Sequence, residues 1–315
     1  MTTREVLITG GAGFIGANLC RAFLAADYSV TVIDDLSTGH RSNLDGLDLQ
    51  LVEGSILDAD TVAAVTPNDG IVIHLAALGS VPRSVADPVG SHSVNATGTL
   101  QVLEAAREAD AAHVVLASSS SVYGDSDAPA KHELLPIAPK SPYGASKLAA
   151  EAYALAYQRT YGLPVLAFRF FNVFGPLQTA GHAYAAVVPS FVDRALRGEP
   201  LIVHGDGKQS RDFTFVGTVC ATILDAVRRR VCFDGPVNLA FGTQVPLLDV
   251  IELLADEVGT ALELEHVEPR AGDIRHSKAD PTRLLTLFPE IEPVDIATGV
   301  RATVEWFRTG AVSSS

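Results

Sequence analysis

Residues 6–16 of the chain read VLITGGAGFIG. The apolar start of this stretch is typical of a short buried strand, and from Ile15 to Ala26 the apolar side chains recur at helical spacing. The three glycines between strand and helix, at spacing GxxGxxG, allow a tight turn and a close approach of the backbone to a phosphate group. Free N–H groups and the positive end of the helix dipole would then face that anion. The order of strand, glycine loop and helix therefore predicts a dinucleotide-binding α/β fold.

The same alternation continues through the first half of the chain. Strand-like runs lie at residues 29–33, 49–52, 71–75, 113–116 and 165–171, with helical stretches between most of them. Buried, β-branched strands that alternate with helices are typical of a parallel sheet covered on both faces. We therefore expect a Rossmann-like, doubly wound parallel sheet.

Capping residues mark the limits of several helices. Ser141 and Pro142 are a good N-cap and first helical residue, and Gly162 suits the end of a helix that spans 142–161. Two further helices are expected, from about Tyr184 to Gly198 and from about Thr218 to the Arg228–Arg230 run, where cations favour the helix C-terminus.

Beyond about residue 174, glycine and proline become denser and the alternation weakens. We expect a dinucleotide-binding domain of residues 1–173, to which residues 212–241 return. Residues 174–211 and 242–315 would form a smaller C-terminal α/β lobe that binds the substrate.

Composition excludes several classes of protein. The 315 residues carry a formal net charge of −14, which argues against a nucleic-acid partner and against an anionic membrane surface. No uncharged apolar run reaches the ~18 residues of a membrane span, and the N-terminus lacks the pattern of a secretion signal. The three cysteines are few and follow no motif, so we expect reduced thiols and a cytoplasmic protein. Neither HExxH nor CxxC occurs, and no metal site is predicted.

Two sets of polar residues indicate redox chemistry on a hydroxyl group. Asp34 ends the second strand, 18 residues after Gly16, where a carboxylate would accept both ribose hydroxyls and repel a 2′-phosphate; this favours NAD over NADP.

Tyr143 and Lys147 lie one helical turn apart, and a serine run follows the strand at 113–116. Free tyrosine has a pKa near ~10, and a tyrosine that acts as a base needs a pKa about three units lower. This shift corresponds to roughly 4 kcal/mol, which the charge of a cation at about 4 Å could supply.

These motifs, with Asn95 and the Arg169-Phe170-Phe171-Asn172 run, resemble the extended short-chain dehydrogenase/reductases over nearly the whole chain. The subgroup most similar is the NAD-dependent UDP-sugar 4-epimerases. The resemblance implies catalytic roles for Ser119, Tyr143 and Lys147. It implies NAD contacts, besides those of Tyr143 and Lys147, for Gly10, Gly13, Phe14, Ile15, Gly16, Asp34, Asp35, Ser37, Gly39, Ile56, Leu75, Ala76, Asn95 and Phe170. It implies nucleotide-sugar contacts for Ser80, Ser119, Ser120, Asn172, Ala186, Val187, His204, Arg211, Arg270, Asp273 and Ser277.

The resemblance also implies a substrate and an assembly. The stretch HLAALGSVPRS at residues 74–84 is similar to epimerases of UDP-N-acetylhexosamines, and Ser277 stands where epimerases specific for UDP-galactose carry a bulky tyrosine. A homodimer is expected through the helices at 94–109 and 143–161.

Other functions on the same fold stay open. Nucleotide-sugar 4,6-dehydratases and uronate decarboxylases carry carboxylates near the positions of Ser120 and Ser121, whose hydroxyls cannot replace them. A sugar 4-reductase would usually prefer NADP, and Asp34 opposes that preference. A non-catalytic NAD-binding regulator would bind the cofactor without turning over a nucleotide sugar.

Overall fold

A seven-stranded parallel sheet forms the centre of the molecule. The computed structural model describes residues 4–126, 128–180, 186–268 and 275–310. Every pairing within the sheet is parallel, and each strand presents its carboxyl end to the same edge. The order across the sheet is β3 (Gln50–Glu53), β2 (Ser29–Asp34), β1 (Glu5–Thr9), β4 (Ile71–His74), β5 (His113–Ser119), β6 (Val165–Phe170) and β11 (Pro236–Leu239). This order, which reverses between β1 and β4, confirms the Rossmann-like fold.

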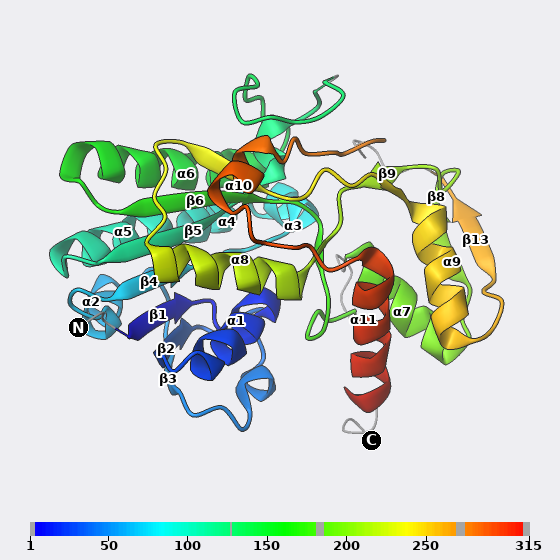
Figure 1. Cartoon of the computed structure of the whole chain (residues 1–315), viewed down its shortest axis with the longest axis horizontal. Coiled ribbons are helices and arrows are strands. Elements are labelled where there is room, and N and C mark those ends of the chain that lie inside the picture. Colours follow the sequence, from blue (N-terminus) through cyan, green and yellow to red (C-terminus); the bar gives the residue numbers. More distant parts are fainter. Residues whose placement is uncertain (1–3, 127, 181–185, 269–274, 311–315) are drawn as a thin grey trace.

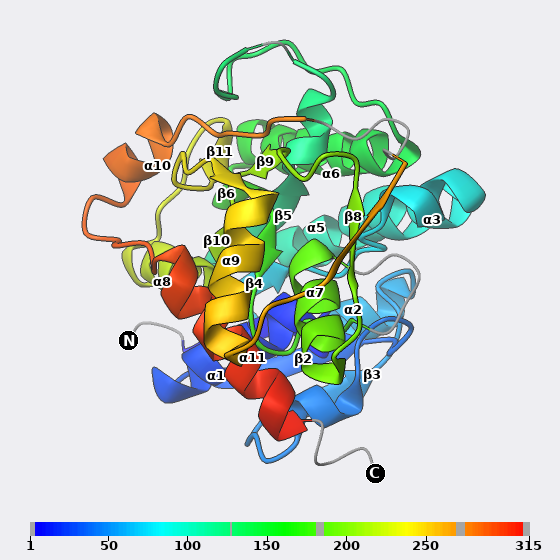
Figure 2. The ribbon, with the colours of Figure 1, turned by 90° about the vertical axis from the view of Figure 1, so that its right-hand side faces the viewer.

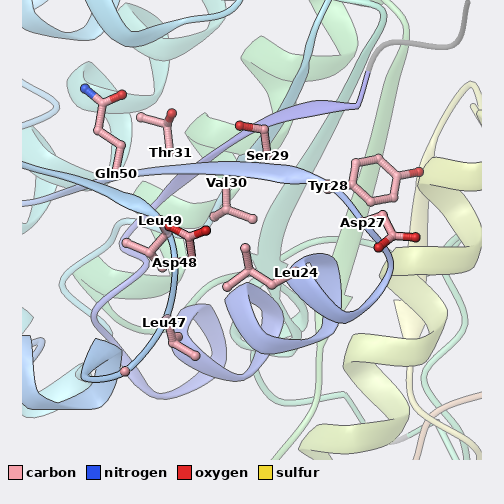
Figure 3. Close-up of a pocket in the computed structure, with 11 residues that line it drawn as sticks. Leu24, Asp27, Tyr28, Ser29, Val30, Thr31, Leu47, Asp48, Leu49 and Gln50 are labelled. Carbon is pink, nitrogen blue, oxygen red and sulfur yellow. The ribbon is translucent and has the colours of Figure 1, made fainter.

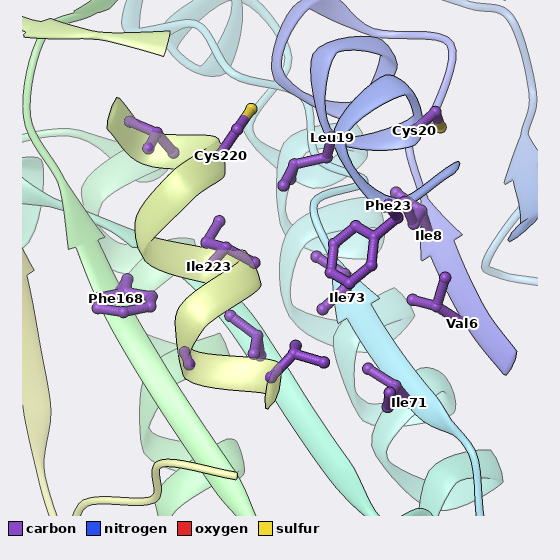
Figure 4. Close-up of a cluster of buried hydrophobic side chains, with 14 of the residues drawn as sticks. Val6, Ile8, Leu19, Cys20, Phe23, Ile71, Ile73, Phe168, Cys220 and Ile223 are labelled. Atoms are coloured by element: carbon purple, nitrogen blue, oxygen red, sulfur yellow. The ribbon is translucent and has the colours of Figure 1, made fainter. Parts of the chain in front are cut away.

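Helices cover both faces of the sheet (Figure 1). On one face, α1 (Phe14–Ala25) packs beside α8 (Val216–Arg229), and their apolar side chains meet those of the strands in one core, which Figure 4 shows. On the other face lie α2 (Ala59–Val65), α5 (Thr99–Glu108) and α6 (Pro142–Tyr161), which share a second apolar cluster with the sheet.

The predicted helix limits are largely confirmed. The Ser141 hydroxyl accepts a hydrogen bond from the Gly144 N–H at 3.1 Å, and Gly162 ends α6 with φ of 72°. Around the expected helix at 94–109 the structure differs, because residues Ser93–Gly98 are wound as a π-helix before α5 begins. The helix predicted from Tyr184 includes α7 (Val187–Arg197), and its predicted start lies outside the described residues.

The C-terminal half has an apolar core of its own, separate from the core that the sheet forms with the helices on its two faces. The helices that build the C-terminal core stand together in Figure 2. This core is built by α7 with β8 (Leu201–His204), α9 (Leu247–Val258) and α11 (Ile296–Gly310), and β13 (Leu264–Val267) pairs with β8. Residues 212–241 supply α8 and β11 to the sheet domain. The predicted boundary between the two domains differs at α10 (Thr282–Leu287). The side chains of Leu284 and of the following Phe288 belong to the apolar core that α1 and α8 form with the sheet.

Short elements connect the two cores. β7 (Val173–Phe174) pairs with β10 (Thr214–Phe215), and β9 (Ser210–Arg211) pairs with β12 (Val245–Pro246).

The sheet domain has further short elements. The helices α3 (Val81–Ala86) and α4 (Pro88–His92) follow β4, and short 3₁₀ turns lie at Arg41–Leu44 and Ser120–Tyr123. No helix within the described ranges is long and apolar enough to cross a membrane.

A depression of about 680 Å³ lies at the amino ends of β2 and β3, lined by residues of both strands and of the loops before them (Figure 3). In a parallel sheet of this order, ligands bind at the opposite, carboxyl edge. None of the residues that the sequence predicts to bind cofactor or substrate lines this depression.

Candidate active site

The glycine loop between β1 and α1 has room for backbone alone. Gly10 has φ of +71°, and a Cβ added to it would lie 2.7 Å from the Ala76 amide nitrogen. A Cβ on Gly16 would lie 2.3 Å from the Gly10 carbonyl oxygen. Side chains are therefore excluded from a surface at which α1 begins. Such a bare helix N-terminus fits the diphosphate of a dinucleotide.

Asp34 is buried at the end of β2 and holds two loops. One of its carboxylate oxygens accepts the Ala12 N–H at 2.9 Å, and the other accepts the Leu36 N–H at 2.9 Å. Burial raises the pKa of the Asp34 carboxyl, and these two hydrogen bonds oppose that shift. The carboxylate thus stands against the glycine loop, where the ribose of a dinucleotide would need it. Beside it, Asp35 accepts hydrogen bonds from the Ser37 N–H and hydroxyl.

Asn95 joins the segment after β4 to α6. Its amide oxygen accepts the Leu78 N–H at 2.8 Å, and its amide nitrogen donates to the Ser146 hydroxyl at 3.0 Å. Ser146 in turn donates to the Tyr143 carbonyl at 2.8 Å. Asn95 therefore positions backbone on both sides of the site. Its place in the π-helix agrees with the frequent occurrence of such bulges at functional sites.

A buried histidine lies at the end of β4. His74 Nδ1 is 2.7 Å from the Thr9 hydroxyl and His74 Nε2 is 2.8 Å from the Thr99 hydroxyl. Burial, together with the smaller effect of the nearby Lys147 charge, lowers the pKa of His74 to about 3. The Thr99 hydroxyl donates to the Asn95 carbonyl at 2.7 Å. This neutral chain ties the strand before the glycine loop to the π-helix.

Ser119, Tyr143 and Lys147 come together where β5 ends and α6 begins. The Ser84 hydroxyl of α3 accepts the Tyr143 N–H at 3.0 Å and so fixes the start of α6. The Ser119 hydroxyl accepts the Ser121 N–H at 3.1 Å and hydrogen bonds to the Tyr143 phenol. Hydroxyl, phenol and ammonium are thus presented at the carboxyl edge of the sheet.

Burial controls the protonation of this group. It raises the pKa of the Tyr143 phenol, and the hydrogen bond with Ser119 opposes that rise. It also lowers the pKa of the Lys147 ammonium to about 8, while the Glu151 charge opposes the shift. The expected lowering of the Tyr143 pKa by Lys147 is not seen in this structure. Removal from water disfavours both charged forms, and a phenolate base needs further positive charge beside it.

The predicted sugar-nucleotide residues occupy the junction of the two cores. The Asn172 side chain donates to the Asp212 carbonyl at 3.2 Å, and Ser277 N donates to the Ser210 carbonyl at 3.1 Å. Arg211 lies on β9, between Ser210 and Asp212 in the chain, and its guanidinium donates to the Ser210 carbonyl at 2.9 Å. Asn172, Arg211 and Ser277 are thus held on adjoining segments.

Other predicted residues are more dispersed. His204 ends β8, where its Nδ1 lies 3.1 Å from the Glu268 carbonyl, and Ala186 and Val187 begin α7. Ser80 caps α3, and Ser120 begins the turn after β5. Arg270 and Asp273 lie outside the described residues.

The remaining predicted NAD residues lie near the carboxyl edge of the sheet. They occupy the ends of strands, the segments that follow them and the start of α1: Phe14, Ile15, Gly39, Ile56, Leu75, Ala76 and Phe170.

Sequence patterns did not predict the buried residues that hold together the elements carrying Ser119, Tyr143 and Lys147. Glu151 belongs to no motif, and Ser84, Ser118 and Arg169 were noted only as parts of longer runs. Their contacts join residues up to 59 positions apart in the chain. A buried charge in an otherwise apolar strand, as Arg169 is in β6, was the available signal for a buried partner.

The chain is similar to known proteins over almost its full length. A model described as the NAD dependent epimerase/dehydratase family matches residues 6–238. The UDP-glucose 4-epimerase of Mycolicibacterium smegmatis is 37% identical over 316 residues, which cover 96% of this chain and 98% of that protein.

Solved structures are similar to the same extent. A UDP-N-acetylglucosamine 4-epimerase from Methanobrevibacter ruminantium, in complex with UDP-N-acetylmuramic acid, has a TM-score of 0.92 at 34% identity and covers 98% of this chain and 100% of its own. A dTDP-glucose 4,6-dehydratase from Streptomyces venezuelae, solved with NAD, has a TM-score of 0.89 at 31% identity and covers 98% of both chains.

Proposed function

The chain belongs to the NAD-dependent epimerase/dehydratase family, with NAD as its cofactor, and from this premise we propose that it inverts C4 of a UDP-hexose. The observation that carries the proposal is the meeting of Ser119, Tyr143 and Lys147 at the carboxyl edge of the sheet. Ser120 and Ser121 follow in the next turn. Because they offer hydroxyls where water elimination needs a carboxylic acid and a carboxylate, epimerisation is favoured over dehydration.

In this proposal the chain's own groups move one proton and hold the sugar. Tyr143, as phenolate, takes the proton of the sugar 4-hydroxyl, and Ser119 hydrogen bonds to that hydroxyl and relays the proton. Lys147 stabilises the phenolate by its charge. NAD, when bound, supplies a reversible hydride acceptor beside C4 and a positive ring charge that favours the phenolate.

Inversion requires the 4-keto sugar to turn and present its other face. Arg211 and Asn172 stand on segments suited to holding a diphosphate while the sugar turns, and a guanidinium provides paired, charge-assisted hydrogen bonds to phosphate oxygens. Arg270 is proposed as a second diphosphate ligand from the sequence alone. The reaction has no net change in oxidation state, so the cofactor should stay bound through turnover.

The test is proton NMR of the purified protein with equal amounts of UDP-glucose, UDP-N-acetylglucosamine and UDP-glucuronate, without added NAD. Growth of anomeric signals of the galacto configuration is expected, and the fastest signal names the preferred sugar. Formation of a 4-keto-6-deoxy sugar would instead support a dehydratase. Turnover that needs a 4-keto sugar and added NADH or NADPH would support a reductase. Tight NAD binding without any turnover would support a regulator.

We further propose that N-acetylhexosamines are accepted. Ser277 is 5% exposed and is fixed by its backbone beside Ser210 and Arg211. A hydroxymethyl side chain at this place takes up less room than the tyrosine ring that epimerases specific for UDP-galactose carry there. The relative that binds UDP-N-acetylmuramic acid supports a site with room at C2 of the sugar.

We also propose a homodimer formed through the helices at 94–109 and 143–161, the second of which is α6. This helix exposes Ala145, Ala152, Tyr153 and Ala156, which lie about one or two turns apart along it. Exposed alanines let a second helix approach closely, and an exposed tyrosine adds apolar area with a polar tip.

A further inference from the structure

A buried ion pair joins the elements that carry the proposed catalytic residues. Glu151 of α6 binds Arg169 of β6 through two hydrogen bonds, Nη2–Oε1 at 2.6 Å and Nε–Oε2 at 2.9 Å. The two side chains are 3% and 1% exposed. The Ser118 hydroxyl of β5 donates to the same Oε2 atom at 2.7 Å. One carboxylate therefore bridges a helix and two neighbouring strands.

Each member of this network stands next to a residue of the proposed site. Ser118 immediately precedes Ser119, and Arg169 immediately precedes Phe170, a predicted NAD contact. Glu151 follows Lys147 by four residues, which places both side chains on one face of α6. Movement of the Glu151 carboxylate would thus displace the hydroxyl and the ammonium relative to each other.

The network leaves the Lys147 ammonium available. Both Glu151 oxygens already accept hydrogen bonds, three in all, from Arg169 and Ser118. Among the residues that the structure describes, none accepts a hydrogen bond from the buried Lys147 ammonium. Glu151 therefore acts on Lys147 through its charge and does not capture the ammonium protons.

We infer that Glu151, locked by Arg169 and Ser118, is a positioning residue that keeps Lys147 both charged and free to bind the cofactor and the phenol. This inference rests on the function proposed above. Replacing the Glu151 carboxylate should make the ammonium lose its proton more easily, whereas removing the Arg169 guanidinium should expose Lys147 to an uncompensated anion. The two changes should therefore have opposite effects on the titration of Lys147.

The surroundings of Lys147 contain few other titratable groups. Burial lowers its pKa to about 8, and Glu151 opposes that shift. Around it stand Tyr143 on the preceding turn of α6, His74 at the end of β4 and Arg169 behind Glu151. His74 stays neutral above about pH 3 because burial lowers its pKa. The charge balance is thus dominated by Glu151 and Arg169.

The experiment follows the titration of Lys147 by NMR in protein labelled at the lysine Cε. The chain has five lysines, and the Lys147 signal is the one that Lys147→Arg removes. In Glu151→Gln the midpoint should fall by about one unit or more, and in Arg169→Met it should rise. In the wild type and both variants, the alkaline limb of kcat/KM should move with the NMR midpoint. Ser118→Ala, which removes no charge, is the matched control and should shift the midpoint least.

Several results would overturn the inference. Midpoints that stay unchanged in folded variants, or that shift in the same direction, would leave the ion pair with a structural role alone. If Glu151→Gln does not fold, the double variant Glu151→Gln/Arg169→Met removes both charges, and its midpoint should lie below that of the wild type; an equal or higher midpoint contradicts the inference. If the wild type converts no UDP-sugar, the proposed function fails, while the NMR midpoints still decide whether Glu151 controls Lys147.

Discussion

At the scale of single residues, Tyr143 tests the chemistry most directly. Tyr143→Phe removes the phenol and keeps the ring, so the fold and the start of α6, which Ser84 holds through the backbone, should persist. Loss of a general base costs about 10²–10⁴-fold, and we expect kcat to fall by at least about 100-fold. NAD that copurifies with the variant, measured by absorbance after denaturation, should stay within twofold of the wild type. Near-full activity would refute the role of Tyr143.

Ser277 tests the choice of sugar. In Ser277→Tyr the ring would occupy space beside Ser210 and Arg211. We expect kcat/KM for UDP-N-acetylglucosamine to fall about tenfold or more relative to UDP-glucose, because a clash at one substituent is worth roughly 1–3 kcal/mol. Ser277→Ala, which keeps the space open, is the control. Equal losses for both sugars would place Ser277 away from C2 of the hexose.

At the scale of elements, the junction of β1 and α1 depends on the absence of a side chain. Gly16→Ala puts a Cβ 2.3 Å from the Gly10 carbonyl oxygen, so the loop must move. The free energy of unfolding should fall by about 1–3 kcal/mol, and NAD should be retained poorly. Gly79→Ala, whose Cβ meets nothing within 4 Å, is the matched control for urea unfolding. Equal stability of the two variants would contradict this account.

Elements with local signals could be predicted, and those held by distant partners could not. Ser141 and Gly162 limit α6 by contacts within four residues, and both ends were predicted. The edge strand β11 carries no comparable signal, because its register depends on β6, some 70 residues earlier. The same holds for the site: spacing indicated Tyr143 and Lys147, whereas the role of Glu151 appears only when β5 and β6 meet α6.

At the scale of the whole molecule, the two cores meet at Asp212. Its buried carboxylate accepts hydrogen bonds from the Gly242 and Ala279 N–H groups and from the Thr243 hydroxyl. Two distant segments of the chain, at residues 242–243 and at residue 279, are thereby held next to Arg211. The position of the guanidinium is thus set by the joining of the cores, which explains why this part of the site could be inferred only from resemblance.

The proposed dimer gives a second prediction at this scale. Ala152→Arg places a charged side chain on the exposed face of α6, which should leave the fold intact because Ala152 packs against nothing in the interior. Sedimentation velocity should show a dimer for the wild type and a monomer for the variant. Thr260→Arg, an exposed position just after α9 in the C-terminal core, is the control and should remain dimeric. A monomeric wild type would end the proposal.

Acid should destabilise the whole fold through two buried histidines. Burial lowers the pKa of His74 to about 3 and that of His113 to about 4, whereas an unfolded histidine titrates near ~6.5. Between about pH 6 and 4 the unfolded chain therefore binds more protons, and stability falls as the pH falls. Each histidine contributes up to about 1.4 kcal/mol per pH unit.

Urea unfolding at a series of pH values measures this slope. His113→Gln removes one of the two groups, so its free energy of unfolding should change less steeply with pH than that of the wild type, by about 1.4 kcal/mol per unit near pH 5. The comparison of slopes is independent of any uniform loss of stability from the substitution itself. If the slope for His113→Gln equals that of the wild type, His113 takes up its proton in the folded chain as it does in the unfolded one. The His113 side chain, which is 0% exposed at the start of β5, would then have to be less completely buried in solution.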